Sequence, residues 1–253
     1  MVTVNHDNNH DNNHDNSERF LNTFIEIEQE LKLIVGNDKF VPFYNLVSRA
    51  SSKNKTVRAF EIYLKEYADL RNAIVHERIN GEPIAEPHEK TVLHLEEILN
   101  TISSPPRIEE GFLGEVVTCT PYDPIGYAIK RMHHESFSQF PVYDNCKFVG
   151  LLTSETVTRW VAGKLSCGIG LIEEESVFEV LKFTENTDNH AFIDKKATLF
   201  EALSLFQEFN KKGKTLKAII VTKSGKKNEF PVGIITVFDL PKLYHRVGLE
   251  ISL

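Results

Sequence analysis

Residues 150–156, GLLTSET, and residues 233–239, GIITVFD, share the pattern that decides the fold of the second half of this chain. In each stretch a glycine and two aliphatic residues precede a threonine, and a helical pattern follows. Short aliphatic runs are typical of buried strands, and threonine is a preferred residue at the start of a helix. Each stretch therefore predicts a strand that passes directly into a helix.

The elements before these two stretches also repeat. Hydrophobic spacing predicts the order strand, helix, strand, strand twice, first in residues 116–119, 125–133, 139–143 and 147–153, and then in residues 191–194, 199–209, 216–222 and 232–236. An internal repeat of this length predicts a pseudo-twofold α/β module, with a ligand in the cleft between its copies.

Thr236 and Asp239 are the polar residues of the second stretch that could hold a ligand. Unpaired N–H groups at a helix start suit phosphate, the threonine adds a hydroxyl, and a carboxylate can accept both hydroxyls of a ribose. The same spacing is also a capping box, which needs no ligand. On the motif alone, the capping role is favoured.

The repeated pattern resembles a tandem pair of CBS domains over about residues 112–250. The middle strands FPVYDN at 140–145 and KAIIVTK at 217–223 carry the resemblance, together with the two threonine endings. We expect the first domain at 112–165, a connecting segment at 166–190 and the second domain at 191–253.

This resemblance implies a regulatory ligand: AMP, ADP, ATP or S-adenosylmethionine. It implies that Thr236 contacts phosphate, that Asp239 binds the ribose, and that adenine lies near Ala218, Ile219 and Ile193. The first copy retains Thr153. It has Thr156 where the second copy has Asp239, so we expect one competent nucleotide site and not two.

The first part of the chain has a different composition. Residues 5–16 read NHDNNHDNNHDN, and such a polar tract cannot bury enough surface to offset its ordering entropy, so we expect disorder over residues 1–17. Its histidines could chelate a metal weakly, but a solvated tail is the favoured interpretation, and we expect no metal site. Helical spacing then predicts a four-helix domain at 18–103, with helices at about 17–34, 41–49, 56–77 and 89–102. The prolines after Ser104 predict a linker at 104–111.

The third predicted helix contains Arg71, Asn72 and His76. Histidine moves protons near neutral pH and arginine binds phosphate with a planar fork, so this set could cleave RNA without a metal. Arg71 and His76 are separated by about 140° of rotation and about 7.5 Å of rise, so we expect one helix not to focus both on one point. Arginine and histidine near a helix C-terminus are also simply favourable with its dipole.

The arginine, polar residue and histidine on the third helix of a helical bundle are similar to the Arg-x4–6-His motif of HEPN domains, over about residues 18–103. Many HEPN domains are endoribonucleases that need no metal and that dimerise to bring two motifs together. The resemblance implies that Arg71 binds phosphate, that His76 is the acid or base, and that Asn72 orients them. Some members of this superfamily do not cleave RNA.

Composition limits these interpretations. The net charge is −7, and residues 112–253 carry equal numbers of acidic and basic residues, so no segment has the basic excess of a protein held to nucleic acid by phosphate contacts. No apolar run approaches the roughly 18 residues that span a bilayer, and the first residues do not form a signal peptide, so we expect no membrane partner and a cytoplasmic location. Three scattered cysteines agree with a reducing compartment.

The sequence therefore predicts an α+β multi-domain protein in which an N-terminal HEPN-like four-helix bundle precedes a pseudo-twofold CBS-domain pair. The leading hypothesis is a homodimeric sensor of adenine nucleotides that controls a ribonuclease. The alternatives are a sensor whose helical domain serves only dimerisation or partner docking, and a CBS pair with a purely structural role.

Overall fold

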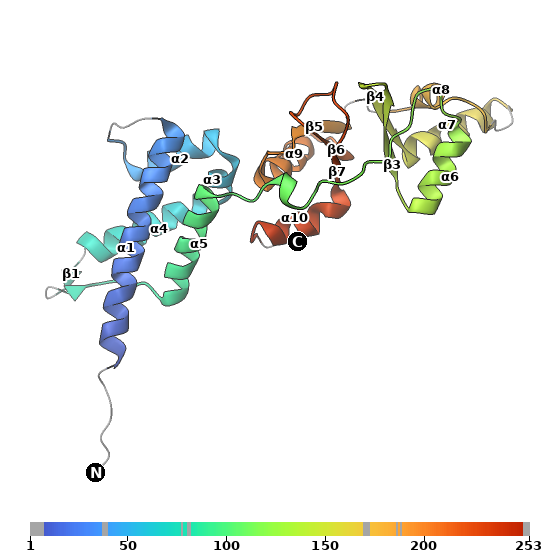
Figure 1. Ribbon diagram of the computed structural model, residues 1–253. Coiled ribbons are helices and arrows are strands. Elements are labelled where there is room, and N and C mark those ends of the chain that lie inside the picture. Colours follow the sequence, from blue (N-terminus) through green and yellow to red (C-terminus); the bar gives the residue numbers. More distant parts are fainter. Residues whose placement is uncertain are drawn as a thin grey trace, which may run out of the picture. The chain divides into compact units, whose positions relative to one another are not determined.

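The computed structural model describes residues 8–36, 40–76, 78–79, 82–168, 173–185, 187 and 189–249. The chain divides into two compact units, residues 1–106 and residues 107–253, and each is considered by itself. The first unit is coloured blue to green in Figure 1, and the second is coloured green to red.

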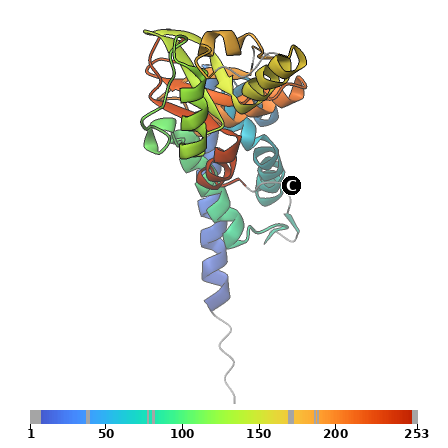
Figure 2. The ribbon, with the colours of Figure 1, turned by 90° about the vertical axis from the view of Figure 1, so that its right-hand side faces the viewer.

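The first unit is helical (Figures 1 and 2). Its helices α1, α2 and α5 correspond to three of the four predicted helices, while the remaining one is divided into α3 and α4. The bounds are Asn8–Val35 for α1, Phe43–Lys53 for α2, Lys55–Ala59 for α3, Glu61–His76 for α4 and Glu89–Ser103 for α5. A short antiparallel pair follows α4, formed by β1 (Arg78–Ile79) and β2 (Glu82–Pro83).

The core of this unit follows the predicted apolar spacing. Helix α1 packs against α2 and α5, and α2 packs against α4. The largest fully buried side chains are Phe20, Ile27, Leu31, Leu46, Leu64, Leu95 and Ile98. Helix α1 ends at Val35, and the next residue, Gly36, has a φ of +70°, a conformation that glycine adopts without steric cost.

Two predictions for this unit were wrong in detail. Helix α1 begins at Asn8, so residues 8–17 are helical where we expected disorder; extending a helix that the apolar residues have already nucleated costs little per residue. Residues 1–7 lie outside the described residues. The predicted third helix is interrupted at Phe60, whose backbone φ of −104° and ψ of 8° depart from helical values while its side chain is buried.

The second unit contains the predicted repeat. The elements of its first copy are α6 (Ile125–Glu135), β3 (Gln139–Asp144), β4 (Lys147–Thr153) and α7 (Ser154–Ser166), and those of its second copy are β5 (His190–Asp194), α9 (Leu199–Lys211), β6 (Ala218–Thr222), β7 (Gly233–Thr236), η2 (Val237–Asp239) and α10 (Leu240–Arg246). Strands β3 and β4 are antiparallel, while β6 pairs with β5 in parallel and with β7 in antiparallel.

The strand predicted at residues 116–119 is reduced to one parallel bridge between Cys119 and Val142. Cys119 donates its amide to the carbonyl of Pro141, and its own carbonyl accepts from Tyr143. The next donor along that edge would be residue 141, which is a proline and has no N–H. The prediction of a strand at residues 116–119 was therefore wrong, because β3 has no N–H at Pro141 with which to extend the ladder to Val117.

Two other boundaries also differ from the sequence predictions. Residues 107–111, predicted as linker, belong to the second unit: Ile108 in the short helix η1 (Ile108–Glu110) is fully buried, and its amide donates to the carbonyl of Ala197. The predicted connecting segment contains a helix, α8 (Val177–Leu181), which packs into the core of the first copy through Val177 and Val180.

Aromatic side chains join the two copies. The ring of Phe148 in β4 lies 5.0 Å from that of Phe192 and 4.6 Å from that of His190, both in β5. Tyr143 stacks on Phe230 at 5.7 Å. These contacts hold the sheets of the two copies side by side and so define the clefts between them.

Candidate functional site

The second motif forms the predicted cap. Thr236, at the end of β7, accepts a hydrogen bond from the amide of Phe238 at 3.3 Å. The Thr236 amide donates to Asp239 Oδ2 at 2.8 Å, and the threonine hydroxyl donates to the same oxygen at 3.1 Å. The capping box therefore fixes the Asp239 carboxylate beside the start of η2, and both bonds use one of its two oxygens.

A cavity of about 380 Å³ opens beside this cap, a size at the lower end of the range for small-molecule sites. Much of its lining comes from the first copy and from the segment before α6. The lining residues are Glu115, Val116, Val117, Ser136, Phe137, Ser138, Gln139, Phe140, Pro141, Ile234, Thr236, Phe238 and Asp239. The structure thus brings Thr236 and Asp239 together at a cavity between the two copies.

The three residues expected near adenine do not line this cavity. Ala218 and Ile219 are fully buried in β6. Ile193 lies on β5, where it pairs with Val221 of β6, so β6 separates it from the motif strand β7. Ala218 is the antiparallel strand partner of Thr236, so it lies next to the motif in the sheet without lining the cavity. The apolar surface at the cavity comes instead from residues such as Val116, Val117 and Ile234.

The equivalent cleft of the first copy is built around Thr153. Thr153 caps α7 by accepting from the Thr156 amide at 3.1 Å, and the two hydroxyls lie 3.0 Å apart. Both side chains are buried, and they face a cavity of about 210 Å³. Thr156 stands where the second copy has Asp239, so the acceptor pair of a carboxylate is replaced by one hydroxyl.

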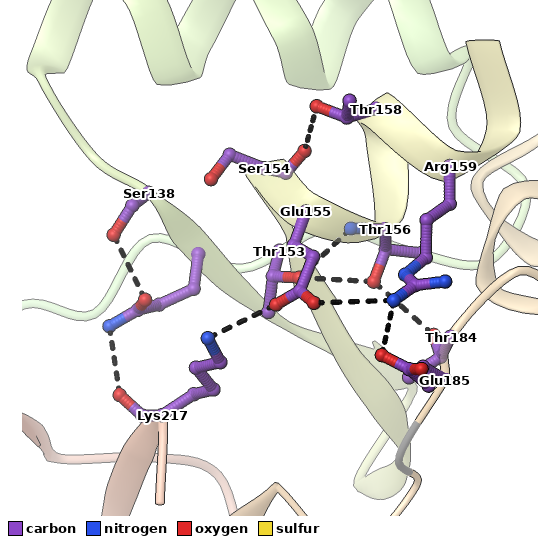
Figure 3. Close-up of polar contacts among 11 residues, drawn as sticks. Ser138, Thr153, Ser154, Glu155, Thr156, Thr158, Arg159, Thr184, Glu185 and Lys217 are labelled. Carbon is purple, nitrogen blue, oxygen red and sulfur yellow. Dashed lines mark hydrogen bonds and ion pairs between the residues drawn. The ribbon is translucent and has the colours of Figure 1, made fainter. Parts of the chain in front are cut away.

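Charged side chains from both copies cross this first cleft (Figure 3). Lys217, immediately before β6, lies 3.1 Å from Glu155 Oε2. Arg159 forms ion pairs with Glu155, at 3.7 Å, and with Glu185. The hydrogen bond from Lys217 and its positive charge lower the pKa of the Glu155 carboxyl.

The sequence motifs did not single out Glu155, Arg159 or Glu115. The position of Glu155 in the sequence was a signal, because it follows the cap Thr153 by two residues and the helix dipole stabilises a carboxylate in the first turn. No local pattern could show that Lys217 reaches it from the other copy.

The three residues of the helical unit lie together at the end of α4. Arg71 Nη1 donates to Asn72 Oδ1 at 3.2 Å and lies 3.1 Å from His76 Nε2. The expectation that one helix could not focus Arg71 and His76 was wrong, because the long arginine side chain spans the turn between them. A guanidinium can only donate, so in this arrangement Nε2 accepts and the neutral imidazole carries its proton on Nδ1.

The family model of the CBS domain matches residues 113–163 and 177–245. No curated protein matches the chain. No described helix is long and apolar enough to cross a membrane.

Solved structures also match the chain. One is an uncharacterized conserved protein from Pyrococcus horikoshii, with 22% identity, a TM-score of 0.40, and 54% of this chain and 90% of that chain covered. CBSX2 in complex with AMP has 13% identity and a TM-score of 0.42, with 56% and 98% covered. The CBS-domain pair of protein MJ0100, in complex with 5′-methylthioadenosine and S-adenosyl-L-methionine, has 16% identity and a TM-score of 0.40, with 55% and 95% covered.

Proposed function

Starting from a tandem pair of CBS domains in residues 113–163 and 177–245, we propose that this protein senses an adenosyl ligand and uses it to regulate its helical unit. The ligand would be AMP, ADP, ATP or S-adenosylmethionine. One observation carries the proposal: Thr236 and Asp239 lie side by side at a cavity between the two copies.

The cavity combines the groups that an adenosine needs. The carboxylate of Asp239 can accept the two hydroxyls of a ribose, and Val116, Val117 and Ile234 offer apolar surface to a purine. Phe238 also lines the cavity and is 80% exposed, so a planar base could cover its ring. A ligand that covered Phe238 would change the surface around η2.

The charge of the lining favours some of these ligands over others. Glu115 and Asp239 are both carboxylates, and a phosphate chain next to them is repelled. We therefore expect S-adenosylmethionine, whose sulfonium is positive, and AMP to bind more tightly than ATP.

Calorimetry with the full chain tests the ligand site. We expect Asp239→Ala to weaken binding of the tightest ligand at least about tenfold, since hydrogen bonds to a charged group contribute about 1.5 to 3 kcal/mol. The matched control is Glu201→Ala, because Glu201 closes the capping box of α9 with Thr198 as Asp239 does with Thr236. Unchanged binding by Asp239→Ala, or an equal loss in both variants, would remove Asp239 from the site.

The regulated output that we propose is cleavage of RNA by a homodimer of the helical unit. The ribose 2′-hydroxyl would attack the adjacent phosphorus and the bond to the 5′-oxygen would break, giving a 2′,3′-cyclic phosphate and a 5′-hydroxyl. His76 would move the proton, Arg71 would bind the phosphate, and Asn72 would orient Arg71 through the bond at 3.2 Å.

This output has its own test. RNA incubated with wild-type protein in EDTA should yield cyclic phosphate ends, and His76→Ala should lower the rate at least about a hundredfold, the usual contribution of a general acid or base. His88→Ala is the control, since His88 is exposed at the start of α5. Equal rates for wild type and His76→Ala would contradict the assignment.

A second candidate function is a sensor without catalysis, whose helical unit serves dimerisation or partner docking. The charge distribution favours it, because the acidic excess of the chain lies before residue 112 and would repel RNA. Ligand binding by the second unit together with no cleavage of any RNA would select this function. In either case the ligand regulates only if it binds one state of the helical unit more tightly than another.

A further inference from the structure

The first cleft has the parts of an anion site. Helix α7, with 13 residues, begins at it, and the cap Thr153 and the neighbouring Thr156 place two buried hydroxyls at the cavity. Lys217 and Arg159 also line it. A helix start, hydroxyls and two cations together are a common way of holding phosphate.

The same cleft already contains a carboxylate of the chain. Glu155 lies between the two cations, with Lys217 Nζ 3.1 Å from Oε2 and Arg159 Nη2 3.7 Å from Oε1, as Figure 3 shows. Arg159 is also paired with Glu185. Two carboxylates thus balance the two cations, and an incoming phosphate would find both partners engaged.

A hydrogen bond from the first copy holds the backbone of Lys217. Gln139 donates from Nε2 to the Lys217 carbonyl at 3.3 Å, and Ser138 donates to Gln139 Oε1 at 2.9 Å. The backbone that carries Lys217 is therefore tied to β3 of the other copy. The bond from Gln139 places the Lys217 backbone at the cleft, and from there the side chain reaches Glu155.

We infer that Glu155 determines the specificity of the first cleft: it occupies Lys217 and Arg159 in place of an anionic ligand and so restricts nucleotide binding to the second cleft. The missing carboxylate at Thr156 weakens contact with a ribose, whereas Glu155 blocks the phosphate. The two residues act on different parts of a nucleotide, and only Glu155 acts on an anion that has no ribose.

Inorganic phosphate is therefore the decisive probe. We expect Glu155→Gln to bind phosphate at least about tenfold more tightly than wild type, since one charge of a partly exposed ion pair is removed next to the site. Adding Lys217→Ala to Glu155→Gln should abolish the gain. Calorimetry at low ionic strength measures both effects, and Glu173→Gln is the control because Glu173 forms an exposed ion pair with Lys130 at 3.0 Å.

AMP gives a second measurement, in a variant whose second cleft is weakened. In an Asp239→Ala background, in which we expect the second site to bind at least about tenfold more weakly, Glu155→Gln should increase the affinity for AMP and Glu173→Gln should not. Thermal unfolding followed by circular dichroism confirms that each variant is folded.

The outcomes separate this inference from the proposed function. Equal phosphate affinity in wild type and Glu155→Gln, or a gain that survives Lys217→Ala, would overturn the role of Glu155 whatever the second cleft binds. Failure of wild type to bind any adenosyl ligand would overturn the proposed function, yet the phosphate comparison would still decide the inference.

Discussion

At the scale of single residues, burial decides which groups can react. Cys119 is 2% exposed in the core of the first copy, and burial raises the pKa of its thiol to about 12. Tyr143 in β3, whose amide donates to the Cys119 carbonyl, is also buried, and burial raises the pKa of its phenol to about 12 as well. Cys146 and Cys167 are exposed. The three thiols therefore differ in accessibility although the sequence shows no difference between them.

We expect iodoacetamide at about pH 8 to label two cysteines of the native protein, Cys146 and Cys167, because Cys119 is neither accessible nor ionised. Mass spectrometry of tryptic peptides measures the labelling, and denatured protein supplies the control with three labelled sites. Rapid labelling of Cys119 in folded protein would contradict the structure.

The same shifts fix the sign of a pH dependence. Cys119 and Tyr143 have folded pKa values above their unfolded values, so their contribution to stability is complete below the unfolded pKa and is lost as the pH rises towards about 12. The protein should therefore lose stability in alkali, and Cys119→Ser would test the thiol's share.

At the scale of elements, the two glycines of the repeated motif have different roles. A Cβ on Gly233 would lie 2.4 Å from the carbonyl oxygen of Phe112, because the segment before α6 passes close to β7. A Cβ on Gly150 would lie 3.4 Å from the flexible side chain of Leu181, which is ordinary contact. Only the second motif needs glycine for the close approach of two backbones.

We expect Gly233→Ala to lower the free energy of unfolding by about 1 to 3 kcal/mol, the usual cost of overpacking, and Gly150→Ala to change it by less than about 1 kcal/mol. Urea unfolding of the two variants, which share one sequence motif and act as each other's control, measures the difference. Equal destabilisation would show that the contact with Phe112 does not constrain β7.

At the scale of the whole molecule, the acidic excess lies before residue 112, and the repeated module has equal numbers of acidic and basic residues. Within that neutral module charge is local: carboxylates line the second cleft, whereas the first holds balanced ion pairs. The overall charge of −7 therefore says little about which ligand either cleft takes.

Much of the fold of the second unit was predictable, because hydrophobic spacing and turn residues are local signals. They placed β3, β4, β6 and β7 within about two residues. The segment at Val116 was not predictable in this way, since its strand is interrupted by Pro141 of a neighbouring element. The break at Phe60 likewise falls within one continuous helical spacing of apolar residues, so that spacing could not locate it.

The candidate site was predictable in part for the same reason. Thr236 and Asp239 belong to one local motif, and the structure places both at a cavity. The other walls of that cavity, and the pair of Lys217 with Glu155, arise from segments far apart in the chain. Periodicity carries no information about such pairs.

Pro141 has a consequence for how a base could be read. The donor missing at this residue would have met the carbonyl of Val117, and both residues line the second cavity. The Val117 carbonyl therefore receives no ladder bond from residue 141, and its donor must come from another group. If the proposed adenosyl ligand supplied that donor through the exocyclic amine of its adenine, a peptide group would recognise the base, and such recognition leaves no side-chain signature in a sequence.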